Sequence, residues 1–243
     1  MLAVLKRLLL ILLLLKGVAF GQTQNEFWAK VYVSEKINPH WTIGADVQHR
    51  RQADYVRHEK NIFHYTLSNI ARLWAFYKLD NNWTVVTSPL GYFYNEDIDK
   101  YSGALSCSSD LRSMAGISKT YFPGKISNNN RFLYEVDLLD FNSKYSSSIR
   151  HRYRLLNSLS WPVKKINNNQ SFSYNFFNEI FYKTESGSSS FDQDHIYNGF
   201  QWKIKSSAFN IGYQYTYEKS DNYFVKKNQF LLSLNVTLVK RKV

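Results

Sequence analysis

The feature that most constrains this fold is the alternation of apolar and polar residues along the C-terminal hairpin, residues 208–239. Every second residue from Phe209 to Tyr217 is aromatic or aliphatic, and after a polar loop the alternation resumes from Phe230 to Leu238. A period of two places apolar side chains on one face of a strand and polar ones on the other. The pattern recurs back to about residue 26, so the sequence predicts an all-β protein built from consecutive hairpins.

Hydropathy and strand length together indicate a membrane-spanning barrel. The mean hydropathy of −0.41 is too polar for a bundle of membrane helices, but it fits a barrel with a wet lumen and an apolar outer face. Most predicted strands reach the roughly 9–11 residues that a tilted membrane strand needs, whereas strands of soluble sandwiches run to about five or six. The sequence therefore predicts one transmembrane antiparallel up-and-down β-barrel over residues 22–243.

The number of strands is set by the alternation and by a rule of barrel construction. Eleven strands are visible in the sequence, yet bacterial single-chain barrels have even numbers. We therefore expect between about 10 and 12 strands, with 12 favoured. The twelfth would lie within residues 98–110, or residues 22–27 would cross the lumen instead. The turns expected on the periplasmic side are 38–39, 80–82, 123–130, 162–169 and 205–207.

The first 21 residues have the pattern of a cleaved signal peptide. Lys6 and Arg7 precede an unbroken apolar run, Leu8 to Leu15, and Ala19-Phe20-Gly21 supplies small residues before a cut at Gln22. The run is far shorter than the roughly 20 residues of a spanning helix. A secreted barrel is expected in the outer membrane of a Gram-negative bacterium, with outer-membrane lipid and the barrel assembly machinery as partners.

The distribution of charge, the single cysteine and the spacing of the histidines argue against nucleic-acid-binding, disulfide-rich and zinc-binding proteins. The formal net charge is +12, but the basic residues are dispersed among strands, so nucleic acid is excluded as a partner and a lumen or rim facing anionic lipid or small solutes is favoured. The single cysteine, Cys107, excludes an intramolecular disulfide framework, and the six histidines form no zinc motif. No cofactor or metal site is predicted, and the sequence defines no oligomeric state.

Several stretches together resemble a known family. They are the region around Trp28, RHRYRL at 150–155, YNFFNEIFY at 174–182, FDQDHIYNGFQWKI at 191–204 and IGYQYTYEK at 211–219. The set resembles the bacterial outer-membrane barrels grouped as domain of unknown function 2490, over about residues 24 to 240. The resemblance implies an outer-membrane barrel, and it supplies no established activity and no functional residues.

The sharpest candidate site is a group of charged residues on the polar faces of three consecutive strands. Its members are Glu135, Asp137, Arg150, Arg152, Arg154 and Glu179. Adjacent strands lie about 4.8 Å apart, so these groups can pair across the lumen wall. One interpretation is a salt-bridged lining that narrows the bore. The other is a basic ladder that selects small anionic solutes.

Aromatic residues suggest both an interface and a filled bore. Trp41, Trp83, Trp161 and Trp202 fall next to predicted periplasmic turns. An aromatic girdle belongs at that level, so we interpret them as interfacial anchors rather than as ligand-stacking platforms. Trp74, Phe76 and Phe181 fall on or near polar phases of their strands and predict a partly filled lumen.

The leading functional hypothesis is a non-enzymatic barrel that is structural or passes small anionic solutes. One alternative is an outer-membrane lipid hydrolase with a serine nucleophile and a histidine base at the rim. No histidine here is followed two residues later by serine; His64 and Ser68 are four apart, His151 falls on the apolar phase, and His195 lies near a predicted loop. A further alternative is a soluble periplasmic barrel that binds an apolar ligand.

Overall fold

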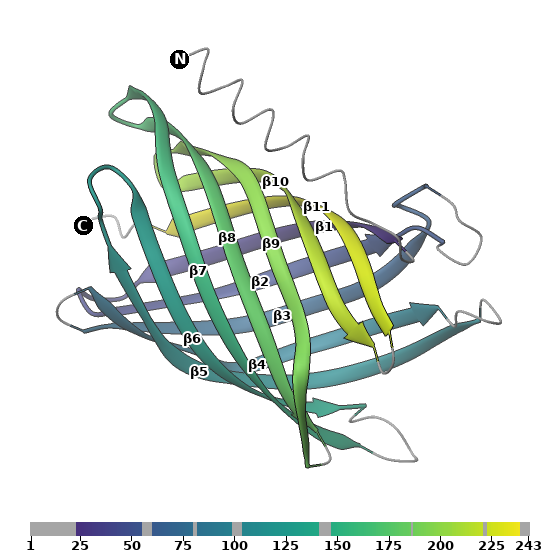
Figure 1. The fold of residues 1–243 in the computed structure, drawn as a ribbon. Helices are drawn as coiled ribbons and strands as arrows, with labels where there is room; N and C mark the ends of the chain where they lie inside the picture. The colour runs from purple at the N-terminus through teal and green to yellow at the C-terminus, as the bar shows by residue number, and fades with distance from the viewer. Residues whose placement is uncertain are drawn as a thin grey trace.

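The computed structural model describes residues 23–54, 60–79, 82–98, 104–140, 147–185, 187–220 and 223–238. The predicted signal peptide, residues 1–21, lies outside these ranges. The described residues form eleven strands that close into a barrel (Figure 1). They are β1 (Thr23–Lys36), β2 (Trp41–Gln52), β3 (Tyr65–Lys78), β4 (Trp83–Ile98), β5 (Leu105–Tyr121), β6 (Ser127–Leu139), β7 (Ser148–Asn167), β8 (Gln170–Glu185), β9 (Ser188–Ile204), β10 (Ser207–Ser220) and β11 (Tyr223–Leu238).

The barrel closes through a parallel pair, which corrects two expectations. Consecutive strands pair antiparallel, but β1 pairs parallel with β11, from Thr23 opposite Lys226 to Glu35 opposite Leu238. The expected twelfth strand and the antiparallel closure were both wrong. With an odd number of strands the first and last run in the same direction, and a parallel ladder satisfies their backbone groups without another strand. Residues 105–110 belong to β5, and residues 23–27 belong to β1 rather than crossing the lumen.

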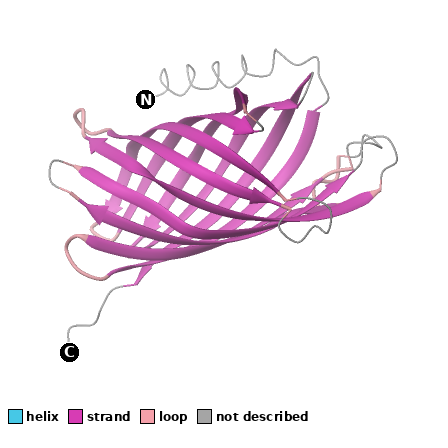
Figure 2. Cartoon of the chain, turned by 90° about the horizontal axis from the view of Figure 1, so that it is seen from below, coloured by secondary structure: helices cyan, strands magenta, loops and turns pink. Residues whose placement is uncertain are grey.

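The connections divide the barrel into two ends (Figure 2). We call the end that carries the β1–β2, β3–β4, β5–β6, β7–β8 and β9–β10 connections the turn rim, and the opposite end the loop rim. Two predicted turns, 123–130 and 162–169, are shorter than expected, because β6 already begins at Ser127 and β7 runs through Pro162 to Asn167. The β7–β8 register shifts between Pro162 and Lys164. The proline therefore sits at an irregularity, where its missing N–H removes no regular ladder hydrogen bond.

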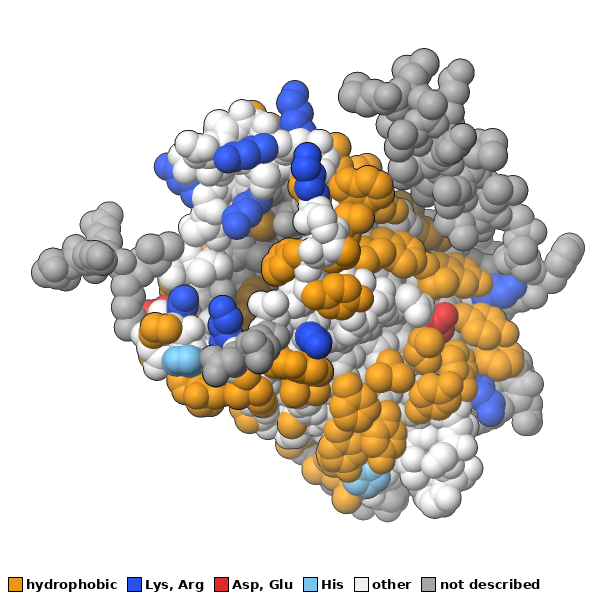
Figure 3. Space-filling view, turned by 60° about the vertical axis from the view of Figure 1, so that its left-hand side comes forward, with side chains coloured by type: hydrophobic (Ala, Val, Ile, Leu, Met, Phe, Trp, Pro, Cys, Tyr) orange, Lys and Arg blue, Asp and Glu red, His pale blue; other side chains and the backbone are white. Residues whose placement is uncertain are grey.

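The alternation places apolar side chains outside and polar ones inside. Ile211 and Phe230 on the outer face are 64% and 51% exposed, whereas Gln214 and Gln229 on the inner face are each 2% exposed. Figure 3 shows hydrophobic side chains spread over the outside of the barrel. This is the arrangement of a membrane-type barrel, and a soluble barrel around an apolar ligand would have the reverse. Within the described ranges, no helix is long and apolar enough to cross a membrane.

One side of the lumen is packed with apolar side chains. Val86, Met114 and Leu133, on β4, β5 and β6, form a buried cluster against which Trp74 and Phe76 pack. Phe181, from β8, is 2% exposed. The bore is therefore partly filled, and the remaining space is lined mainly by polar and charged residues.

Candidate functional site in the lumen

The six charged residues predicted from the sequence come together on β6, β7 and β8. Asp137 lies opposite Arg150, and Glu135 lies opposite Arg152, in the β6–β7 ladder. The Nη2 atom of Arg150 is 2.8 Å from Asp137 Oδ2, and Nη1 of Arg152 is 3.0 Å from Glu135 Oε1. Glu135 and Asp137 are 1% and 0% exposed, so the acidic half of this network is fully enclosed.

Arg154 joins the acidic groups of two strands. Its Nη1 lies 2.8 Å from Glu135 Oε2, and its Nη2 lies 3.1 Å from Glu179 Oε1. Because each carboxylate touches more than one arginine, the ladder behaves as one connected network rather than as separate pairs. Removing one carboxylate would leave an excess of enclosed positive charge that the remaining carboxylates balance only in part.

Other members of the network were not predicted from the sequence. Arg112 donates to Asp110 at 2.9 Å, with its guanidinium 3.8 Å from the centroid of the Phe93 ring. Arg152 Nε lies 3.0 Å from Asp192 Oδ2. Asp110 falls in a stretch that the sequence pattern assigned to a loop, and the β8–β9 register shifts between Phe181 and Tyr182, beside Asp192. Alternation alone therefore could not assign these carboxylates to the lumen.

Two chambers of the lumen are lined by described residues. The turn-side chamber has a volume of about 640 Å³ and the loop-side chamber about 420 Å³. Five residues line both chambers and define what we call the constriction: Trp28, Arg50, Arg72, Arg154 and His195. His195, expected near a loop, thus lies inside the barrel, with its ring centroid 4.7 Å from that of Phe181.

The constriction is held in place by aromatic and amide contacts. The Arg50 guanidinium lies over the Trp28 ring, 3.7 Å from its centroid, and the Trp28 indole N–H donates to Glu26 at 2.7 Å. Glu26 also accepts from Gln229 Nε2 at 2.9 Å. Trp28 is 8% exposed. The indole therefore fixes the position of the arginine above it.

The turn-side chamber carries an excess of positive charge. Its cationic lining residues are Lys30, Arg50, Arg72, Arg131 and Arg154, and its carboxylates are Asp46 and Glu179. Asp46 accepts from Arg72 Nε at 3.0 Å and from Trp74 Nε1 at 2.7 Å. Glu179 lies 3.2 Å from Arg131 Nη2 and 3.1 Å from Arg154 Nη2. Both carboxylates are thus engaged by groups other than Lys30 and Arg50.

Four histidine rings have partners that are not serine. The ring bonds are His40 Nδ1 with the Lys78 carbonyl at 3.0 Å, His49 Nδ1 with Asn69 Oδ1 at 2.7 Å, His151 Nδ1 with Tyr134 Oη at 2.7 Å, and His195 Nε2 with Gln193 Oε1 at 3.0 Å. None of these four histidines is bonded to a nucleophilic hydroxyl of serine. In the part of the chain that is described, no group of three or more His, Cys, Asp or Glu side chains could hold a metal ion.

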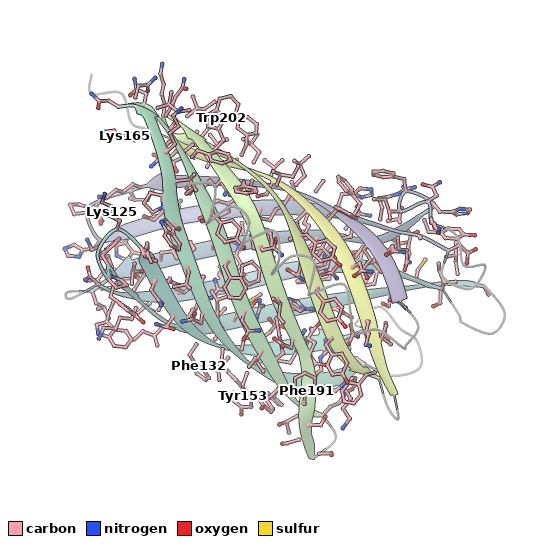
Figure 4. The ribbon with its side chains drawn as sticks, turned by 45° about the horizontal axis from the view of Figure 1, so that its top comes forward. Lys125, Phe132, Tyr153, Lys165, Phe191 and Trp202 are labelled. Atoms are coloured by element: carbon pink, nitrogen blue, oxygen red, sulfur yellow. The ribbon has the colours of Figure 1, made fainter. Side chains whose placement is uncertain are left out.

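The four predicted girdle tryptophans lie near the turn rim. Trp41, Trp161 and Trp202 are 43%, 56% and 44% exposed on the outer face. Trp83 is half-buried beneath Lys119, whose Nζ is 4.9 Å from the ring centroid. Figure 4 shows Trp202 at the same end of the barrel as Lys125 and Lys165, while Phe132 and Tyr153 lie together on β6 and β7.

A closed sheet with an apolar outside and a charged lumen defines a membrane-type β-barrel. The chain belongs to the family described as Protein of unknown function (DUF2490), whose model matches residues 25–227. The family resemblance seen in the sequence is therefore confirmed.

A solved structure with a similar fold is the β domain of the Bordetella autotransporter BrkA. The two share 10% sequence identity with a TM-score of 0.51, and the match covers 79% of each chain. At this identity the likeness concerns the fold alone. No curated protein matches the sequence.

Proposed function

We propose that the protein is a non-enzymatic outer-membrane barrel whose narrow lumen passes small anions. The observation that carries this proposal is the charge of the constriction. The charged residues that face both chambers include Arg50, Arg72 and Arg154. The carboxylate partners of Arg72 and Arg154 are Asp46, Glu135 and Glu179, and each of these lines only one chamber. A solute that moves between the chambers therefore meets a ring of arginines, which favours anions over cations.

Lysines at the turn rim support the same direction of selectivity. Those on or beside the turns are Lys36, Lys78, Lys125, Lys164, Lys165, Lys203 and Lys205, all exposed. Figure 3 shows a cluster of Lys and Arg side chains on the face in view, with others scattered around it. A ring of like charge around an opening raises the local concentration of the opposite charge. We infer that this rim attracts anions towards the turn-side chamber.

The outer-membrane assignment is supported by three features. The outer face is apolar, the predicted signal peptide implies export, and the fold is similar to an autotransporter β domain. The expected partners are outer-membrane lipid around the belt and the barrel assembly machinery during insertion. The turn rim is then periplasmic and the loop rim faces outward.

Neutralising Arg50 tests the proposed pore. We expect anion-selective conductance from the purified barrel in planar bilayers, and we expect Arg50→Gln to lower the chloride-to-potassium permeability ratio about three- to tenfold, because one unit charge leaves the constriction. Lys60→Gln removes the same charge from an exposed loop and serves as the control. Cation selectivity, an unchanged ratio in Arg50→Gln, or silence from a barrel with folded mobility on gels would contradict the proposal.

The girdle tryptophans give a test of membrane anchoring. We expect the combined replacement of Trp41, Trp83, Trp161 and Trp202 by alanine to slow insertion into lipid vesicles severalfold, because the rings stabilise the interface rather than the lumen. The measurement is the fraction of heat-modifiable, folded protein against time. Anion selectivity of the inserted fraction should be unchanged. Normal insertion of the quadruple variant would show that these residues are not anchors.

A further inference from the structure

We infer that the turn-side chamber is a binding site for a small organic anion that carries a flat ring, with Lys30 and Arg50 holding the anionic group. The inference rests on the proposed function, since the ligand must enter the lumen. It goes further, because it assigns a residence site and a chemical class of ligand to one chamber. Two observations support the inference. Two cations of this chamber make no ion pair with a described carboxylate, and aromatic side chains line the chamber beside them.

Lys30 and Arg50 are the two cations lining this chamber that make no ion pair with any carboxylate of the described residues. Lys30 lines the chamber together with the cations Arg50, Arg72 and Arg131 and with the carboxylate of Asp46. Both oxygens of Asp46 already accept from Arg72 and Trp74. Arg50 stacks on Trp28 and donates to Gln48 at 3.4 Å, while its buried Nε has no hydrogen-bond partner. Cations that lack a direct carboxylate contact in a partly enclosed space are stabilised by binding an anion.

The two cations are close enough to share one anionic group. In the β1–β2 ladder Trp28 lies opposite Arg50 and Lys30 lies opposite Gln48. Lys30 and Arg50 are therefore diagonal neighbours on the inner face, with Cα atoms about 7–8 Å apart. Side chains of this length can converge on a carboxylate or phosphate, where the guanidinium supplies a planar fork and the ammonium a point charge.

Aromatic rings lie beside the cations on the same wall. Tyr32 lies opposite Asp46 in the β1–β2 ladder, and Trp74 donates to Asp46. Phe76 stacks near Trp74 with a centroid distance of 6.1 Å. All three rings are half-buried and line the chamber. They can cover a flat ring of a ligand whose anionic end is held by the cations.

A glycine lets Tyr32 lie against the barrel wall. A Cβ added at Gly44 would lie 2.6 Å from the hydroxyl oxygen of Tyr32 and 2.9 Å from its ring carbons. Only a residue without a side chain leaves room for the ring in this position. The chamber volume of about 640 Å³ lies within the 300–1,000 Å³ range of small-molecule sites.

The loop-side chamber lacks the same excess of charge. Its cationic lining residues are Arg50, Arg72, Arg112, Arg150, Arg152, Arg154 and Lys227, and its carboxylates are Glu26, Asp110, Glu135, Asp140, Asp192 and Glu218. Lys227 is satisfied by Glu218 at 2.7 Å. Because the charges there are nearly balanced, the turn-side chamber is the stronger anion site.

The test is isothermal titration calorimetry on the full barrel refolded in detergent micelles. Three probes separate the parts of the proposed ligand: phenyl phosphate, inorganic phosphate and benzyl alcohol at constant ionic strength. We expect phenyl phosphate to bind most tightly. Lys30→Gln and Arg50→Gln should each weaken its binding about tenfold or more, since each removes a charge-assisted contact. Lys60→Gln should leave binding unchanged, and Tyr32→Leu should reduce the preference for phenyl phosphate over inorganic phosphate.

Heat-modifiable mobility of every variant shows that it has folded, and Lys30→Arg, which keeps the charge, should restore most of the affinity. Equal binding of phenyl phosphate by wild type and Lys30→Gln, or no binding by an anion-selective wild-type pore, would overturn the site while the pore proposal stands. Binding that depends on Lys30 in a barrel that is silent in bilayers would support the site and overturn the pore.

Discussion

Replacing Glu135 with glutamine is expected to lower the free energy of unfolding of the barrel by about 3–5 kcal/mol. Glu135 is 1% exposed, and its carboxylate lies 3.0 Å from Arg152 and 2.8 Å from Arg154, with Arg112 at 4.0 Å. Glutamine keeps the shape of the side chain but removes the negative charge that these guanidinium groups share. Arg112, Arg152 and Arg154 each keep at least one other carboxylate contact, with Asp110, Asp192 and Glu179 respectively. The network nevertheless gains one uncompensated positive charge, which is costly in an enclosed space.

The measurement is reversible urea unfolding in lipid vesicles, followed by tryptophan fluorescence. Glu185, at the loop-rim end of β8, lies opposite Arg150 in the β7–β8 ladder but makes no ion pair with the described residues, and it is only partly buried. Glu185→Gln makes the same chemical change and should alter stability by less than about 0.5 kcal/mol. Equal stability of Glu135→Gln and Glu185→Gln would mean that water entering the lumen screens the network.

Replacing Gly116 with alanine is expected to destabilise the barrel by about 3 kcal/mol. An added Cβ would lie 2.0 Å from the carbonyl oxygen of Phe132 and 2.8 Å from the Cα of Leu133. Both atoms belong to the backbone of β6, so the clash cannot be relieved by rotating a side chain. The β5–β6 ladder would have to move, and with it the cluster of Val86, Met114 and Leu133.

Ala115→Val provides the matched control for the glycine variant. Ala115 is the preceding residue of β5 and is exposed on the outer face, so added methyl groups there meet lipid rather than backbone. The same urea titration compares the two. If Gly116→Ala unfolded at the same urea concentration as wild type, the close approach of β5 and β6 at this point would be refuted.

Alternation in the sequence was sufficient to predict the faces of the strands. A two-residue period assigns each side chain to the lumen or the lipid, which is why Arg150, Arg152 and Arg154 could be placed on one face opposite Glu135 and Asp137. The sequence was also sufficient to predict the family and the all-β barrel fold, because both predictions draw on many residues along the chain.

Features that depend on closure and register could not be predicted in the same way. The period of two does not reveal how the first and last strands pair with each other, so the parallel β1–β11 pair was missed. The same limit hid the constriction, where Trp28 and Arg50 from β1 and β2 face His195 from β9 across the bore. Register shifts beside Asp192 and at Pro162 also break the alternation locally.

The parallel pairing of β1 with β11 limits how the two ends of the chain could be joined in a circular permutant. Because β1 and β11 run in the same direction, Thr23 lies at the loop rim and Leu238 at the turn rim, separated by the length of the ladder from Lys226 to Leu238, about 40 Å. A circular permutant would need a linker of at least about 12 extended residues. That linker would have to thread the lumen or run through hydrocarbon with unpaired backbone groups. In an even-stranded barrel the two ends share a rim, and a short turn joins them.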